Sequence, residues 1–173
     1  MGVYQGLELR AARYDKFRKT FDSFHAQAKK LPGAGNPPLL ETLEVGDLTE
    51  PGYFDVSLAG TSVRLQLEYL PGSSRGDSGV VAAYLFDQVT EERAYDPYAR
   101  LEFTTSGKTS WKHERSNDEV TLADDMGSWF VVASLLLQAI DRKQVSPNIL
   151  TDRVEGVLIE TTSKCPRTAN AGR

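Results

Sequence analysis

The chain has 173 residues, of which 40% are hydrophobic and 25% charged, and its net charge is −4. A chain of this length fits one domain and can bury roughly 70% of its unfolded surface, so its core needs no metal or disulfide. The near-average composition argues against general disorder, and the acidic balance disfavours broad binding to nucleic acid. Cys165 has no second cysteine to pair with, which favours a reducing compartment.

The chain shows no targeting segment and no membrane-spanning segment. Residues 1–6 lack the basic region and apolar stretch of a secretory signal. The almost unbroken apolar run 129–137 is shorter than the roughly 20 residues that cross a bilayer. We therefore expect a cytoplasmic protein that does not act at a membrane.

A long amphipathic helix is predicted over residues 7–31, which contain no Gly or Pro and end before Pro32-Gly33. Its apolar residues are spaced by three and four, so they share one face and should pack in the core. They are Tyr14, Phe17, Phe21, Phe24, Ala28 and Leu31. Residues 1–31 carry a net charge of +4 against −8 for the rest. Contact with an acidic partner or nucleic acid through this helix is an alternative, although no aromatic is left for base stacking.

The middle of the chain alternates between apolar and polar residues, as half-buried strands do. Strands are predicted at 54–58, 63–69, 80–86, 100–104 and 109–113, and Leu43 and Val45 add a further short one. The strand at 80–86 is apolar throughout and should be central. Short connections, such as the turn at 59–62, favour antiparallel pairing in a meander of about five or six strands.

A second helix is predicted over residues 121–143. Asp124 and Asp125 lie in its first turns and Arg142 and Lys143 in its last, which suits the helix dipole. The helix is apolar on most sides, so more than one neighbour must cover it. A short strand is predicted at 154–159, and 161–173 has the composition of a mobile tail.

The predicted class is therefore α+β: an antiparallel sheet with an N-terminal and a C-terminal helix packed largely on one face, in a single domain over residues 1–160. The element order is similar to that of type III secretion chaperones, in which a C-terminal apolar helix serves dimerisation. The resemblance rests on the hairpin ending LQLEYLPG at 65–72 and on the second helix. The middle helix of those chaperones is missing, so the resemblance concerns element order and not family membership.

Three short motifs suggest chemistry that their surroundings do not support. Residues 76–79 match the nucleophile tetrapeptide of chymotrypsin-like proteases, but only His25, in a predicted helix, precedes Ser78. Residues 75–77 spell an adhesion tripeptide, which would require export. Residues 106–109 resemble a phosphate loop, but Glu102 replaces its first glycine and no helix follows. We assign all three motifs to loops or turns.

No catalytic, cofactor-binding or metal-binding residues are predicted. His113 and Glu114 are strand neighbours that would point to opposite faces, and His25 and Cys165 have no second ligand at a useful spacing. An acidic cluster follows the central strand: Asp87, Glu91, Glu92 and Asp96. A solvated loop is the simpler interpretation of this cluster, and a catalytic role is the alternative.

The most informative feature is the apolar second helix, which indicates a subunit or partner interface. The expected interface residues are Trp129, Val131, Val132 and Leu135. The sequence thus favours a non-enzymatic protein-binding module, adaptor or chaperone-like, that acts as a homodimer and binds another protein. One alternative is a small-molecule-binding or enzymatic cavity between sheet and helices, and another is nucleic-acid contact through the first helix.

Overall fold

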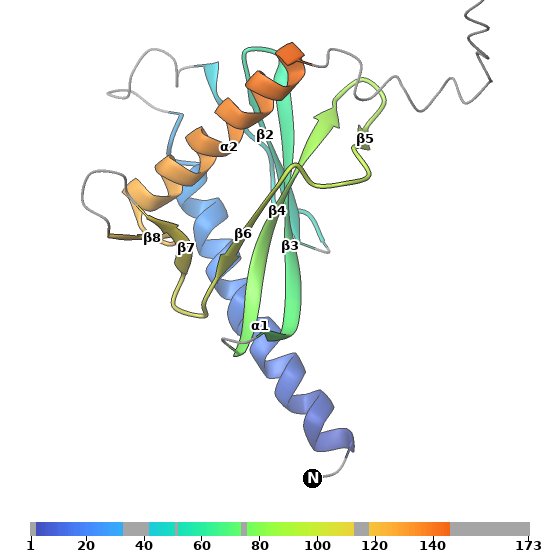
Figure 1. Ribbon diagram of the computed structural model, residues 1–173, viewed down its shortest axis with the longest axis vertical. Coiled ribbons are helices and arrows are strands. Elements are labelled where there is room, and N and C mark those ends of the chain that lie inside the picture. Colours follow the sequence, from blue (N-terminus) through green and yellow to red (C-terminus); the bar gives the residue numbers. More distant parts are fainter. Residues whose placement is uncertain (1–2, 33–41, 51, 74–75, 113–117, 146–173) are drawn as a thin grey trace, which may run out of the picture.

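A computed structural model describes residues 3–32, 42–50, 52–73, 76–112 and 118–145 of the chain (Figure 1). Within these ranges, one helix precedes eight strands along the chain and a second helix follows them. The elements are α1 (Val3–Ala28), β1 (Glu44–Val45), β2 (Tyr53–Leu58), β3 (Thr61–Ser73), β4 (Gly76–Asp87), β5 (Glu92–Arg93), β6 (Ala99–Phe103), β7 (Lys108–Lys112), β8 (Glu119–Thr121) and α2 (Asp125–Val145). The predicted strand at 154–159, the predicted tail at 161–173, and residues His113, Glu114 and Cys165 lie outside the described residues.

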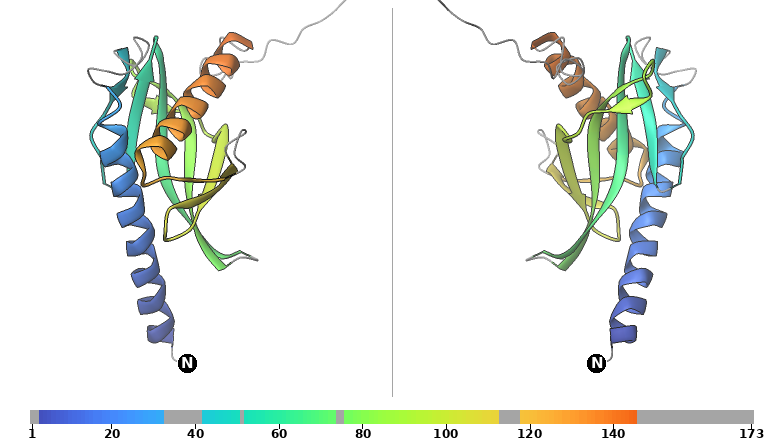
Figure 2. Two further views of the ribbon diagram at one scale, coloured as in Figure 1. Left: turned by 90° about the vertical axis from the view of Figure 1, so that its left-hand side faces the viewer. Right: turned by 90° about the vertical axis from the view of Figure 1, so that its right-hand side faces the viewer.

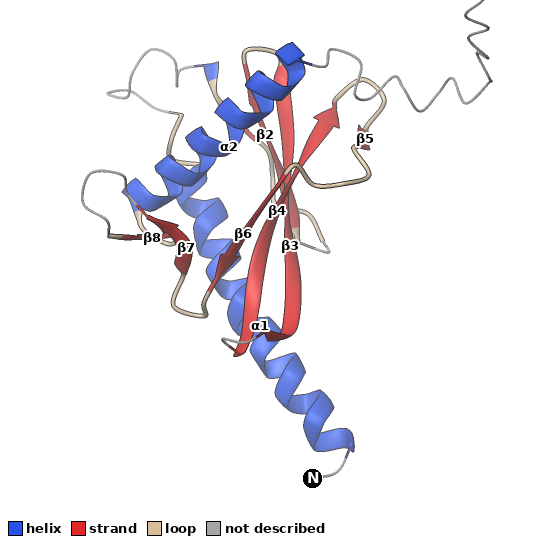
Figure 3. Ribbon diagram, viewed as in Figure 1, coloured by secondary structure: helices blue, strands red, loops and turns tan. Residues whose placement is uncertain are grey.

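The strands form one antiparallel sheet in the order β1-β2-β3-β4-β6-β7-β8, and β5 pairs with the end of β4 (Figure 3). The predicted α+β class with an antiparallel sheet is confirmed. The sheet contains more strands than predicted, since β5 and β8 were not expected from the sequence. Strand β5 has only two residues and β8 only three. Segments this short carry no detectable period of two.

The centre of the sheet is the long hairpin of β3 and β4, in register from Ser62 opposite Phe86 to Leu70 opposite Ser78. The preceding hairpin turns on two residues, Ala59 and Gly60, which both have positive φ. Such a two-residue turn suits the right-handed twist of the strands. The predicted turn at 59–62 is therefore too long, since Thr61 and Ser62 already pair in β3.

Both helices cover the same face of the curved sheet (Figure 2). The apolar residues of the alternating strands point to this face. For example, Phe54 of β2, Leu65 of β3 and Ala83 of β4 lie opposite one another on it. Helix α1 contributes Phe17, Phe21 and Phe24, all buried, and Phe21 and Phe24 pack on Phe54 with ring centroids 5.5 and 5.6 Å away. The prediction of a core-facing aromatic stripe is confirmed.

Helix α1 is longer at its start and shorter at its end than predicted, spanning Val3–Ala28 instead of 7–31. Its last turn tightens after Ala28, where Lys30 and Leu31 donate to carbonyls three residues back. The first turns of the helix extend beyond the β3–β4 hairpin (Figures 1 and 2). The aromatic part of α1 therefore lies on the sheet while its start projects away from it.

Charged and aromatic side chains cover the opposite face of the sheet. Arg64 forms a forked pair with Asp55, at 2.8 and 2.9 Å, and lies 4.1 Å from the ring centroids of both Tyr53 and Phe86. Tyr84 donates to Glu68 at 2.6 Å and lies beneath Arg93. Planar guanidinium groups satisfy carboxylates and rings together, so charged and aromatic side chains pair with one another on this face, where no helix lies.

Helix α2 begins four residues later than predicted, at Asp125 instead of Thr121. Thr121 ends strand β8, and Leu122 is buried in the segment between them. Asp124 is the N-cap, because its Oδ1 accepts the backbone N–H of Gly127 at 2.5 Å. The capping carboxylate, and not the start of the apolar pattern, determines where this helix begins.

Candidate functional site

Helix α2 lies diagonally across the helix-bearing face of the sheet and contacts α1, β2, β3 and β8. Its inner side is buried in the chain's own core: Val131, Val132 and Leu135 are 0%, 2% and 1% exposed. These three residues were predicted to face a second subunit, and that direction is wrong. On a helix apolar on most sides, only the tertiary contacts decide which side faces inward.

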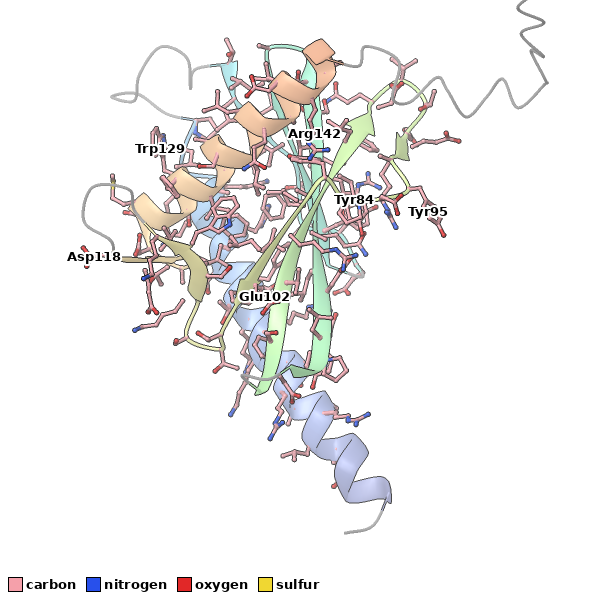
Figure 4. All side chains as sticks on the ribbon, viewed as in Figure 1. Tyr84, Tyr95, Glu102, Asp118, Trp129 and Arg142 are labelled. Atoms are coloured by element: carbon pink, nitrogen blue, oxygen red, sulfur yellow. The ribbon has the colours of Figure 1, made fainter. Side chains whose placement is uncertain are left out.

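Trp129, the fourth predicted interface residue, does lie at the surface and is 37% exposed (Figure 4). Met126 and Leu137 on the same helix are 69% and 58% exposed. The half-buried Ala133 and Ile140 continue this side of the helix at spacings of three and four. We call these five residues the outer stripe: Met126, Trp129, Ala133, Leu137 and Ile140.

The outer stripe lies on a firmly held helix. Tyr98 donates its hydroxyl to the carbonyl of Leu135 at 2.8 Å, and burial raises the pKa of this phenol far above its usual value. At the end of α2, Lys143 donates to the Gly60 carbonyl at 2.8 Å. At its start, the buried Ser128 donates to Leu122 at 2.6 Å. The exposed apolar side chains are therefore presented by a fixed scaffold.

An aromatic pair lies beside the stripe. Trp111 of β7 packs edge-to-face on Phe130 of α2, with ring centroids 6.3 Å apart. Both side chains are half-buried. The pair extends the apolar surface from the helix onto β7. The sequence contained the residues of this surface, but alternating strands and an all-apolar helix gave no sign that Trp111 and Phe130 meet.

The acidic cluster after the central strand surrounds the turn between β4 and β5, since Asp87 ends β4 and Glu92, its partner, begins β5. Asp87 Oδ1 accepts the backbone N–H of Val89 at 2.8 Å and that of Thr90 at 3.4 Å, which is an Asx-type turn. Glu91, Glu92 and Asp96 are exposed. Among the described residues, no three His, Cys, Asp or Glu side chains are grouped as a metal would require. Glu91 and Asp96 lie in loop segments as predicted, whereas Asp87 and Glu92 pair between β4 and β5, so the loop interpretation is wrong for these two.

Asp77 and Ser78 belong to β4, so the assignment of these two motif residues to a loop is wrong. Asp77 pairs with Arg13 and accepts the N–H of Gly72 at 2.9 Å, and these bonds lower its pKa to about 2. Ser78 is buried. His25 is engaged elsewhere, with Nε2 2.9 Å from the Gly46 carbonyl and its ring on Phe54.

The third motif, at 106–109, also lacks the arrangement that its chemistry needs. Lys108 begins strand β7 and pairs with Glu119 of β8 at 3.1 Å, so its assignment to a loop is wrong as well. Strand residues, and not the first turn of a helix, therefore follow Gly107. A phosphate loop presents the amides of a helix start, so this segment cannot act as one.

Comparison of the chain with protein-family models, with curated proteins and with solved structures finds no match in any of the three. The fold and the site therefore define the class of protein directly: an α+β protein whose antiparallel sheet carries two helices on one face and an exposed apolar stripe on the second helix. Neither α1 nor α2, the two helices in the described ranges, has the length and apolar character needed to cross a membrane.

Proposed function

We propose that the chain is a non-enzymatic protein-binding module, adaptor or chaperone-like, that acts as a homodimer through the outer stripe of α2. The observation that carries this proposal is the grouping of Met126, Trp129 and Leu137 on one side of one helix, all exposed. Exposed apolar patches of this kind mark interaction surfaces, and Trp and Met are among the residues enriched in them.

The order of the stripe suits two-fold symmetry. Trp129 and Leu137 lie four residues to either side of Ala133, and Met126 and Ile140 lie seven. Two copies of α2 packed antiparallel around Ala133 would therefore place apolar side chains opposite apolar side chains along the seam. The small side chain of Ala133 would allow the two helix axes to come close at the centre.

The helix ends favour the same arrangement. Helix α2 has an acidic first turn with Asp125, and a last turn with Arg142 and Lys143. Antiparallel packing brings the first turn of one helix to the last turn of the other, so both these charges and the helix dipoles are complementary. A cavity between sheet and helices, the alternative function, has less support, because Phe21, Phe24 and Phe54 pack on one another there.

The test is the molecular mass in solution at micromolar concentration, measured by sedimentation. We expect a dimer for the unchanged chain and a folded monomer for Leu137→Arg. The matched control is Gln138→Arg, which adds the same charge one residue further along, on the exposed polar side of the helix. This control should remain dimeric.

A monomeric unchanged chain would overturn the homodimer. Equal behaviour of Leu137→Arg and Gln138→Arg, with both dimeric, would show that a dimer forms through another surface. Circular dichroism of both variants separates loss of the interface from loss of the fold, because an exposed substitution on a helix rarely changes stability by more than about 0.5 kcal/mol.

A further inference from the structure

A groove that contains two lysines lies beside α1, next to the segment that precedes α2. It is an open cavity of about 430 Å³. Helix α1 contributes Lys16, Lys19, Thr20 and Ser23, the β6–β7 turn contributes Thr105 and Ser106, and Ala123 before α2 completes the lining. Cavities of roughly 300–1,000 Å³ hold small molecules, so the groove is large enough for a ligand.

Hydrogen bonds hold the two walls of the groove together. Thr20 shares its hydroxyl between the carbonyls of Lys16, at 3.2 Å, and Thr105, at 3.0 Å. The turn that carries Thr105 closes with Gly107 donating to Thr104 at 2.8 Å, and Leu122 donates to Gly107 at 2.9 Å. Helix, turn and the segment before α2 are thus linked, and the groove keeps its shape without a ligand.

The groove collects positive charge that the protein does not neutralise. Arg13, Arg18 and Lys29 of the α1 region each form an ion pair with a carboxylate. Lys16 and Lys19 are exposed and form no ion pair with any described residue. No acidic side chain lines the groove, and the neighbouring Asp124 directs Oδ1 to the Gly127 N–H. Lys16 and Lys19 are therefore the cationic side chains that line this cavity, and neither charge is neutralised by an ion pair with a described residue. Other lysines without such an ion pair, for example Lys30 and Lys112, lie outside the groove.

From this arrangement we infer that the groove binds a phosphate group, free or as a small phosphate monoester. Two ammonium groups match the double negative charge of phosphate better than the single charge of a carboxylate. Ser23 and Ser106 lie at the rim, but the Ser23 hydroxyl donates to the Lys19 carbonyl at 2.9 Å and that of Ser106 pairs with Thr104 at 2.9 Å, so the two ammonium groups carry the recognition. This site lies on α1 and does not depend on self-association through α2, so either proposal can fail without the other.

The test is a titration of the whole chain, at about 0.1 M ionic strength, with inorganic phosphate and separately with phenyl phosphate. Changes in the backbone amide chemical shifts, measured by NMR, identify the residues that bind the probe. Saturable changes should be concentrated at residues 16–23 and 105–106 in at least one titration, and the two arms distinguish the free anion from the ester. Substituting Lys16→Gln and Lys19→Gln together should weaken binding by at least about tenfold, or about 1.4 kcal/mol.

The matched control removes two positive charges elsewhere, as Arg10→Gln with Lys112→Gln, both exposed and outside the groove. It should change binding by less than about twofold, because exposed charges more than about 10 Å away are largely screened. If both double substitutions weakened phosphate binding equally, binding would reflect nonspecific electrostatic attraction, and the proposed site would be wrong. Shifts spread over the surface, or changes that do not saturate with either probe, would overturn it as well.

Discussion

The ring of Phe103 occupies the space that any side chain at Gly79 would need. A Cβ atom at Gly79 would lie 2.4 Å from Cζ of Phe103, its partner directly across β4 and β6. Phe103 is buried and Phe17 packs against it edge-on at 5.8 Å, so the ring has little room to move. The last glycine of the protease-like tetrapeptide is thus explained by packing.

Gly79→Ala should therefore lower the free energy of unfolding by about 1–3 kcal/mol, the usual cost of adding a group to a filled core. Urea unfolding would measure it. Gly6→Ala is the control, because a Cβ at this helical position meets nothing within 4 Å. That change should be neutral or stabilise by up to about 1 kcal/mol. A Gly79→Ala variant as stable as the unchanged chain would mean that the ring can shift.

Phe21→Ala should lower the free energy of unfolding by about 3–5 kcal/mol, because it leaves a cavity in the core. Phe21 is fully buried and packs on Phe24 and Phe54. Leu9→Ala, at an exposed position of the same helix, should change stability by less than about 0.5 kcal/mol. A loss below about 1 kcal/mol for Phe21→Ala would contradict the core placement. Chemical denaturation of both variants decides this.

The ion pair of Arg13 with Asp77 should make the free energy of unfolding depend on pH in the acid range. The hydrogen bond from Arg13 and that from Gly72 hold the pKa of Asp77 at about 2 in the folded chain, against an ordinary value of 3.8. A carboxyl with a lowered folded pKa stabilises the fold above its unfolded pKa, and this contribution is lost as pH falls to the folded value. Asp77→Asn should therefore be less stable than the unchanged chain at neutral pH, and the difference should shrink between about pH 4 and pH 2.

Urea unfolding across that pH window is the measurement. Arg13→Gln should remove much of the same pH-dependent difference, because Arg13 is the main cause of the lowered pKa. Asp96→Asn, at an exposed turn position, serves as the control and should follow the unchanged chain. A stability difference for Asp77→Asn that stays constant from neutral pH to pH 2 would show that the carboxyl's charge does not contribute.

Periodic segments were predictable because each repeats its environment over many residues. The aromatic stripe of α1 and the alternation around Phe54 and Leu65 identified the core face correctly. The start of α2 was missed because Leu122 fits its apolar spacing, although the preceding Thr121 pairs with Lys108 of β7. A two- or three-residue strand is defined by its partner, so only the folded chain reveals it.

Of the candidate site, only the helix that carries it could be predicted from the sequence. The sequence identified α2 as a helix that needs several neighbours, and the structure agrees that part of it stays uncovered. It could not separate Leu135 from Leu137, because both are leucines in the same apolar run. Their difference comes from where α1, β2 and β3 meet the helix, which depends on contacts between residues far apart in sequence.

That difference gives the sharpest test of the site. Leu135 is 1% exposed and Leu137 is 58% exposed, two residues apart on the same helix. Leu135→Glu would place a carboxylate in the core without a partner, and it should unfold the chain or cost more than about 4 kcal/mol. Leu137→Glu should change the free energy of unfolding of the folded monomer by less than about 0.5 kcal/mol. Denaturation of the two variants, followed by circular dichroism, would compare them directly. A folded, stable Leu135→Glu monomer would mean that this side of α2 is the outward one and that the assignment of the outer stripe is wrong.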